Sequence, residues 1–185
     1  MTIFGRLSTI AKPGKDLSGL GRASWLLLEN DGRKLRVVTA YRPCVKQYRK
    51  LTKKGRIGQT VWEQHVQFYK EVEGIEEPHP RALFDEYLFG SIKKWRSKGE
   101  EIVLVIDTNE DVYKGPFAEH LASIGVNMTC AYQKVHKQKM PPSHQSGSLP
   151  IMSIVVTPGI TCEHSFIARY GCSVGDHRGP HYLDI

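Results

Sequence analysis

The sequence has no long apolar run and only four cysteines, and each shortage excludes a class of protein. No stretch approaches the roughly 20 apolar residues that a membrane-spanning helix needs. Residues 1–15 lack the apolar block of a secretory signal. The cysteines are scattered and form no C-x-x-C pair, which predicts reduced thiols rather than a disulfide framework or a zinc site. These shortages predict an intracellular protein, nuclear or cytoplasmic, with no membrane partner.

Length and composition indicate one globular domain. The chain has 185 residues, of which 40% are hydrophobic and 24% charged, and it shows no internal repeat. A chain of this length can bury a substantial core. We expect residues 1–16, which are rich in Gly, Ser, Lys and Pro, to form an irregular N-terminus, and residues 17–185 to form the domain.

Apolar patterning predicts an α/β fold. The turn at Asn30-Asp31-Gly32 predicts a hairpin of residues 22–28 and 34–41. Apolar residues three and four apart predict helices over 58–72 and 80–97, and a third helix should cover 116–123. Continuous apolar residues predict a buried strand over 101–107, and further strands should cover 150–157, 165–170 and 181–185. The polar, basic segment 133–147 is expected to be a mobile loop.

The formal charge of +7 is concentrated in two segments. The denser run of basic residues, just after the second predicted strand, could bind phosphates with release of counterions, or it could be a solvated loop. It comprises Lys46, Arg49, Lys50, Lys53, Lys54 and Arg56. The second group lies in the predicted loop and comprises Lys134, His136, Lys137 and Lys139.

Polar side chains follow the apolar runs at three places. Tyr41 ends the predicted hairpin, Asp107 and Asn109 end the buried strand, and Asp176 precedes His177 between two glycines. Each group alone also fits a purely structural role, as a packed aromatic side chain, a turn cap or an exposed loop. Since strand ends of an α/β sheet can meet at one site, we expect these five residues to converge there.

In this order the motifs resemble those of the endonuclease/exonuclease/phosphatase family, which includes pancreatic deoxyribonuclease and the endonuclease domains of retrotransposons. Residues 39–43 (TAYRP) are similar to the strand with a phosphate-contacting Tyr, and 105–109 (VIDTN) to a Gly-Asp-x-Asn strand end. Residues 175–178 (GDHR) are similar to the closing Ser-Asp-His motif, and 149–154 to the strand before it. The amino-acid sequence from residues 18–22 onward is most similar to that of retroelement-type members. The resemblance to the family covers about residues 17–185.

The resemblance implies a partial α/β sandwich whose mixed sheets are flanked by helices. The family's N-terminal strands, with an early Asn and a metal-binding Glu, have no counterpart in residues 1–15. One sheet should therefore be nearly whole, and its uncovered apolar face could allow self-association. Met152 also occupies the position of the Asp that orients the catalytic His, and a thioether cannot hold an imidazole N–H as a carboxylate does.

The resemblance also implies the chemistry, which is Mg²⁺-assisted hydrolysis of a phosphodiester. Asp107 would activate water, Asn109 would orient the phosphate or Asp107, and His177 would stabilise the developing charge. Asp176 would help to hold Mg²⁺, and Tyr41 would contact the phosphate. With the early Glu absent and Met at position 152, we expect a truncated, catalytically impaired domain. The alternative is a noncatalytic basic module that binds nucleic acid.

Overall fold

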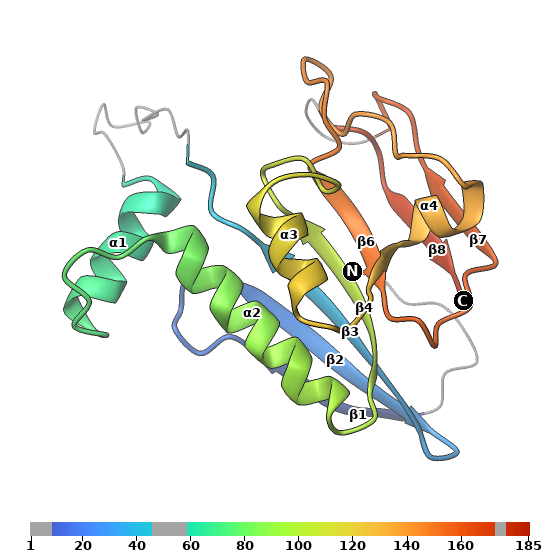
Figure 1. Ribbon diagram of the computed structural model, residues 1–185, viewed down its shortest axis with the longest axis horizontal. Coiled ribbons are helices and arrows are strands. Elements are labelled where there is room, and N and C mark those ends of the chain that lie inside the picture. Colours follow the sequence, from blue (N-terminus) through green and yellow to red (C-terminus); the bar gives the residue numbers. More distant parts are fainter. Residues whose placement is uncertain (1–8, 46–58, 173–176) are drawn as a thin grey trace.

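Two β-sheets and four α-helices make up the part of the chain that the computed structural model describes, residues 9–45, 59–172 and 177–185 (Figure 1). The larger sheet has the strand order β1-β2-β3-β4-β6-β5. Its strands are β1 (Thr9–Lys15), β2 (Ala23–Asn30), β3 (Arg33–Tyr41), β4 (Glu101–Asp107), β5 (Thr129–Cys130) and β6 (Met152–Val156). The smaller sheet is the antiparallel pair β7 (His164–Ile167) and β8 (His181–Asp184). The helices are α1 (Val61–Glu71), α2 (Pro80–Arg96), α3 (Pro116–Ser123) and α4 (Ala131–His136).

The larger sheet is mixed because one of its five pairings is parallel. Strands β3 and β4 run parallel, and the connection between them includes α1 and α2. The β2–β3 hairpin closes through Asp31 and Gly32, whose φ angles of 48° and 75° match the turn type that suits the twist of a two-residue hairpin. Because β3 and β4 are parallel, Tyr41 and Asp107, which are paired in register, end at the same edge of the sheet.

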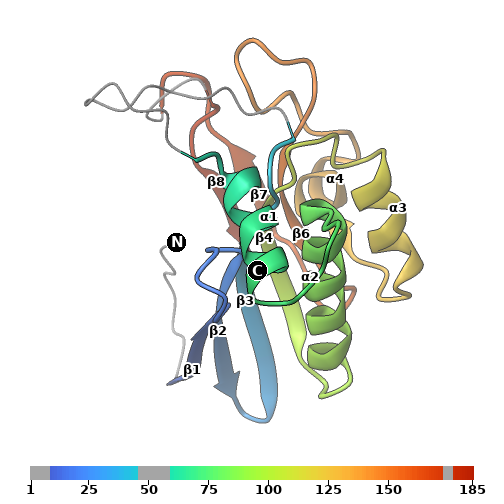
Figure 2. The same cartoon turned by 90° about the vertical axis from the view of Figure 1, so that its left-hand side faces the viewer.

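Each face of the larger sheet is buried by a different set of elements. One face is covered by α2 and α3 (Figure 2). These helices pack on Val38, Leu104 and Val155, and Phe84 and Leu88 of α2 are fully buried. The opposite face holds a second cluster, which includes side chains of β2, β3, β4 and β6, Ala131 of α4 and Leu183 of β8 (members Leu28, Val37, Val103, Val105, Ile154 and Val156 among others). The two-stranded sheet lies at this second face. The arrangement is the partial sandwich expected from the sequence.

Two segments differ from the sequence-based expectation. Residues 9–15, expected to be irregular, form strand β1, which pairs antiparallel with β2. Its Pro13 is tolerated because β1 is an edge strand of the described sheet and can lack one amide donor. Segment 133–147, expected to be a mobile loop, begins inside α4, and its continuation is held by hydrogen bonds from Tyr170 and Arg178 to the Pro142 carbonyl. In both cases tertiary contacts override weak local propensity.

The remaining predicted elements are confirmed within a few residues. Helix α3 has the predicted bounds, and α1 begins at a capping box in which the side chains of Thr60 and Glu63 each accept the backbone N–H of the other residue. The N-cap of α2 is His79, and Pro80 occupies its first turn. Among the described helices, none is long and apolar enough to cross a membrane.

Candidate active site at the strand ends

The ends of β3 and β4 and the start of β6 form a row of side chains on one face of the larger sheet. Asp107 of β4 pairs with Tyr41 of β3 on one side and with Met152 of β6 on the other. Side chains alternate between faces along a strand, and Val103 and Val105 belong to the second hydrophobic cluster. Asp107, Tyr41 and Met152 therefore share the face that carries the two-stranded sheet.

Asn109 turns back toward this row. Its backbone has a φ of 52°, a left-handed conformation that Asn tolerates, and its amide N–H donates to Asp107 Oδ1 at 3.0 Å. The side-chain Nδ2 donates to the Arg42 carbonyl at 2.7 Å, and the side chain also hydrogen-bonds the Tyr41 hydroxyl. Asn109 thus fulfils the turn-capping interpretation and also contacts two other members of the site.

The environment raises the pKa of Asp107 and of Tyr41. For Asp107, burial raises the pKa, and it is opposed by the Asn109 amide and by the charges of His177 and Arg81. For Tyr41, burial and the nearby Asp107 charge raise the pKa, against the hydrogen bond from Asn109. His177 belongs to the same site, because it forms a β-bridge with His144, whose neighbour Ser143 accepts the Met152 amide N–H at 3.2 Å. A carboxyl group with a raised pKa is better suited to accept a proton than an ordinary surface Asp.

The structure thus brings together four of the five residues that the sequence nominated at the strand ends: Tyr41, Asp107, Asn109 and His177. Asp176 lies outside the described residues, as does the whole basic run from Lys46 to Arg56. The structure describes the second basic group, and three of its side chains form hydrogen bonds to backbone carbonyls of the protein. Lys134 Nζ donates to the Ile160 carbonyl, Lys137 Nζ donates to the Lys134 carbonyl at 2.7 Å, and a ring nitrogen of His136 bonds the Ser165 carbonyl at 2.6 Å.

A buried network of ion pairs and hydrogen bonds fixes the ends of β3 and β4 to helix α2. Arg42 is bound by Asp85 of α2 through two hydrogen bonds of 2.7 Å, and its Nη1 lies 2.7 Å from Glu110 Oε2. Arg81 of α2 donates to the carbonyls of Pro43 at 2.8 Å and of Asn109 at 3.0 Å. Helix α2 therefore fixes the segments that follow β3 and β4 relative to each other.

Sequence reasoning missed this network and a second imidazole. Asp85 interrupts the apolar stripe of α2 between Phe84 and Leu88, and a charge at a core position is a signal that could have been noticed. His144 lies next to His177, with ring centroids 5.2 Å apart, and nothing in its loop sequence marks it.

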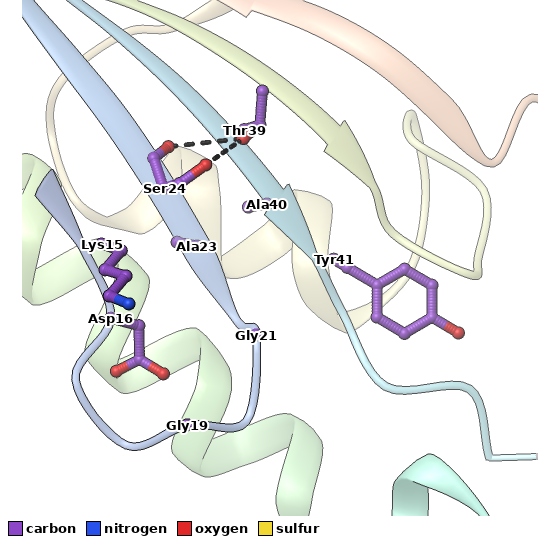
Figure 3. A pocket seen from close by; sticks show the side chains of 9 residues that line it. All are labelled: Lys15, Asp16, Gly19, Gly21, Ala23, Ser24, Thr39, Ala40 and Tyr41. Carbon is purple, nitrogen blue, oxygen red and sulfur yellow. Dashed lines mark hydrogen bonds between the residues drawn. The ribbon is translucent and has the colours of Figure 1, made fainter. Parts of the chain in front are cut away.

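A pocket of about 470 Å³ adjoins the site through Tyr41 (Figure 3). It extends over the ends of β2 and β3, away from Asp107, Asn109 and His177, which do not line it. Its polar wall includes the hydroxyls of Ser24 and Thr39, which are 2.8 Å apart, and the side chain of Lys15.

The described residues do not by themselves make a Mg²⁺ site at the strand ends. Asp107 supplies one carboxylate there, and its Oδ1 already accepts the Asn109 amide. Mg²⁺ requires near-octahedral oxygen coordination. Within residues 9–45, 59–172 and 177–185, the grouping of side chains with metal-ligand spacing is Glu163, His164 and Asp184, which lies on the exposed β7–β8 hairpin.

Comparison with solved structures identifies the fold. A Neisseria 3′ phosphatase bound to a product DNA hairpin superposes with a TM-score of 0.58 at 12% identity, over 96% of this chain and 71% of that chain. A Bacteroides vulgatus endonuclease/exonuclease/phosphatase gives a TM-score of 0.51 at 15% identity, over 88% of this chain and 55% of that one. The fold is that of the endonuclease/exonuclease/phosphatase family. A Leptotrichia buccalis protein of this family also has a TM-score of 0.51, at 10% identity.

The chain spans about half the length of most of these endonuclease/exonuclease/phosphatase structures, with 55% and 54% of the Bacteroides vulgatus and Leptotrichia chains covered. This partial coverage agrees with a second sheet of only two strands among the described residues. No family model matches the sequence, and no curated protein matches it either.

Proposed function

We propose that this chain binds phosphodiesters at the strand-end site and hydrolyses them poorly. The observation that carries the proposal is the convergence of Tyr41, Asp107, Asn109 and His177 at one edge of an endonuclease/exonuclease/phosphatase fold. A carboxylate, an amide, a phenol and an imidazole together provide a proton acceptor and donors for a phosphoryl group. The ancestral reaction would be phosphodiester hydrolysis.

The roles that the family resemblance implies for these residues are compatible with their surroundings. Asp107, whose pKa is raised by burial, is the proposed base that takes a proton from water. Asn109, fixed by its bonds to Asp107 and Arg42, would orient the phosphate. Tyr41 would contact a phosphate oxygen, and His177 would stabilise the charge that develops on it. Asp176 as a Mg²⁺ ligand remains a prediction from the family resemblance.

Impaired hydrolysis is proposed because position 152 lacks a carboxylate. Met152 lies directly opposite Asp107 in the β4–β6 pair, and its thioether is at best a weak acceptor. In serine proteases, the loss of the acid that orients the catalytic His lowers the rate by about 10⁴-fold.

Cleavage assays test the catalytic part of the proposal. The purified chain, with Mg²⁺ added, should cleave duplex DNA, abasic DNA and bis(4-nitrophenyl) phosphate little or not at all. Asp107→Ala and His177→Ala serve as matched controls for contaminating nucleases. Robust cleavage by the wild type that both substitutions abolish would show that the chain is an active enzyme.

A second candidate function is noncatalytic binding of nucleic acid, and the net charge of +7 favours it. We propose that the run from Lys46 to Arg56 contributes most of this binding. Changing its six cations to Gln should lower the slope of log affinity against log salt by up to about 5, since each neutralised phosphate contributes about 0.9 for duplex DNA. Lys134→Gln is the matched control, because its ammonium group is bound to Ile160. An unchanged slope in the six-fold variant would contradict this role.

Both faces of the larger sheet carry packed elements, contrary to the uncovered face expected from the sequence, so self-association is proposed through the outer side of the two-stranded sheet instead. The outer side of the β7–β8 hairpin exposes Phe166 and Tyr182, whose rings are 6.1 Å apart, and their exposed fractions are 58% and 57%. A concentration-independent monomer in sedimentation analysis would contradict it. The relation to retrotransposon endonucleases and the nuclear or cytoplasmic location remain predictions.

A further inference from the structure

The loop between α4 and β6 is closed on itself by Ser143. This side chain is almost fully buried, and its Oγ accepts the amide N–H groups of Ile151 at 3.1 Å and Met152 at 3.2 Å. The Ser143 amide in turn donates to the Leu149 carbonyl at 3.2 Å. The middle of the loop is therefore fixed directly to Met152, the first residue of β6, which pairs with Asp107.

The same loop is fixed to the segment that carries His177. The Tyr170 hydroxyl is 2.8 Å from the Pro142 carbonyl and 2.9 Å from that of His144, and the Arg178 amide donates to the Ser143 carbonyl at 2.8 Å. Arg178 Nε donates to the Pro142 carbonyl at 2.6 Å, and its guanidinium lies over the Tyr170 ring. These bonds set the position of residue 144 relative to residue 177.

The His144 imidazole has a defined orientation and tautomer. Its Nδ1 accepts the Ser146 amide N–H at 3.1 Å, so the neutral ring carries its proton on Nε2. His144 and His177 form an isolated β-bridge, which brings their backbones together. Their rings are nearly perpendicular, at 86°, with centroids 5.2 Å apart. This is an edge-to-face contact, the arrangement that aromatic pairs prefer.

We propose that His144 is a positioning residue for His177. The loop holds His144 rigidly through Ser143, Tyr170 and Arg178, and the ring contact then restricts the His177 imidazole to one orientation. Position 152 carries a thioether and not the acid that the family resemblance would place there, whereas the contact with His144 is a restraint on the ring that the structure does contain. The inference rests on the proposed function in one respect, which is that His177 faces the bound phosphodiester.

The first test needs no ligand. Long-range ¹H–¹⁵N spectra of the imidazole rings are recorded for the wild type, His144→Ala and His144→Phe. His144→Ala should shift the ring resonances of His177, and His144→Phe, which keeps an edge-to-face contact, should restore most of the wild-type pattern. Unchanged amide resonances of Ile151, Met152 and Arg178 would show that the loop is intact. His177 ring signals identical in the wild type and His144→Ala would overturn the proposal.

The second test measures the affinity for bis(4-nitrophenyl) phosphate in a double-mutant cycle. His144→Ala should weaken binding by about two- to tenfold, the range of an aromatic pair contact, and should have no effect in a His177→Ala background. His164→Ala is the matched control, because that imidazole is exposed on the β7–β8 hairpin.

The outcomes separate the two proposals. Binding that His144→Ala weakens equally with and without His177 would overturn the positioning role and leave the proposed function standing. If the wild type does not bind the phosphodiester, the proposed function fails, and the His177 ring resonances alone decide whether His144 positions that ring.

Discussion

Removing Asp85 should cost this fold a large part of its stability. The Arg42 and Asp85 side chains are only 2% and 6% exposed, and two hydrogen bonds of 2.7 Å join them. Asp85→Ala leaves the Arg42 guanidinium buried with Glu110 as its remaining acidic neighbour. Breaking a buried pair by removing one partner typically costs about 3–5 kcal/mol. Since domains are stable by only about 5–15 kcal/mol, we expect a loss of that size in the free energy of unfolding.

A surface pair and a double variant provide the controls. Lys34 and Glu29 lie 4.0 Å apart with side chains 39% and 44% exposed, so Glu29→Ala should change stability by less than about 1 kcal/mol. Replacing both buried partners, as in Arg42→Met with Asp85→Leu, removes the buried guanidinium together with the carboxylate that it has lost. The double variant should therefore recover most of the stability that Asp85→Ala loses.

Urea unfolding followed by circular dichroism measures these differences, provided that the slope with denaturant stays constant across the variants. Because Asn109 Nδ2 donates to the Arg42 carbonyl, the same variants should also disturb the Tyr41 environment, which tyrosine fluorescence or NMR can report. A loss below about 1 kcal/mol for Asp85→Ala, equal to that of Glu29→Ala, would refute the argument that this pair is buried and uncompensated without Asp85.

Three further predictions follow from the titratable groups. Burial raises the pKa of Asp107, so the folded state loses stability as pH rises from the ordinary pKa of 3.8 through the folded pKa. The Asp107→Asn variant should therefore be more stable than the wild type at pH 7 and equally stable in acid. A stability difference in urea unfolding that does not change with pH would contradict this. Burial and the nearby Arg22 lower the pKa of His65, so the wild type should lose stability as pH falls below 6.5 toward the folded pKa. The His65→Gln variant should lack that part of the loss. Identical dependences of unfolding free energy on pH in the two proteins would contradict this. The Met152→Asp variant has a second carboxylate opposite Asp107, which should raise the pKa of Asp107 further. NMR titration of the carboxyl carbons in both proteins tests this, and an unchanged pKa of Asp107 would contradict it.

Local patterns were enough to predict most of the elements. The Asp31-Gly32 turn specifies a hairpin because both residues tolerate positive φ, and the structure has that hairpin. Helix α2 follows from its apolar spacing, and β4 from a continuous apolar run. The polar groups were predicted to converge because strand ends of an α/β sheet can meet at one site, and Tyr41 and Asp107 are indeed paired in register.

Other features depended on contacts between residues far apart in the chain. Strand β1 forms from a segment with Pro13 and Gly14 because β2 offers it a partner, and no local signal required this. The Arg42–Asp85 pair joins residues 43 positions apart, and the contact between His144 and His177 depends on how Tyr170 and Arg178 hold the loop. Periodicity along the sequence therefore determined which residues are buried and which elements form. Only the tertiary structure decided which charges pair, which segments join the sheet edge and which imidazole lies beside His177, because those interactions are set by packing between distant segments.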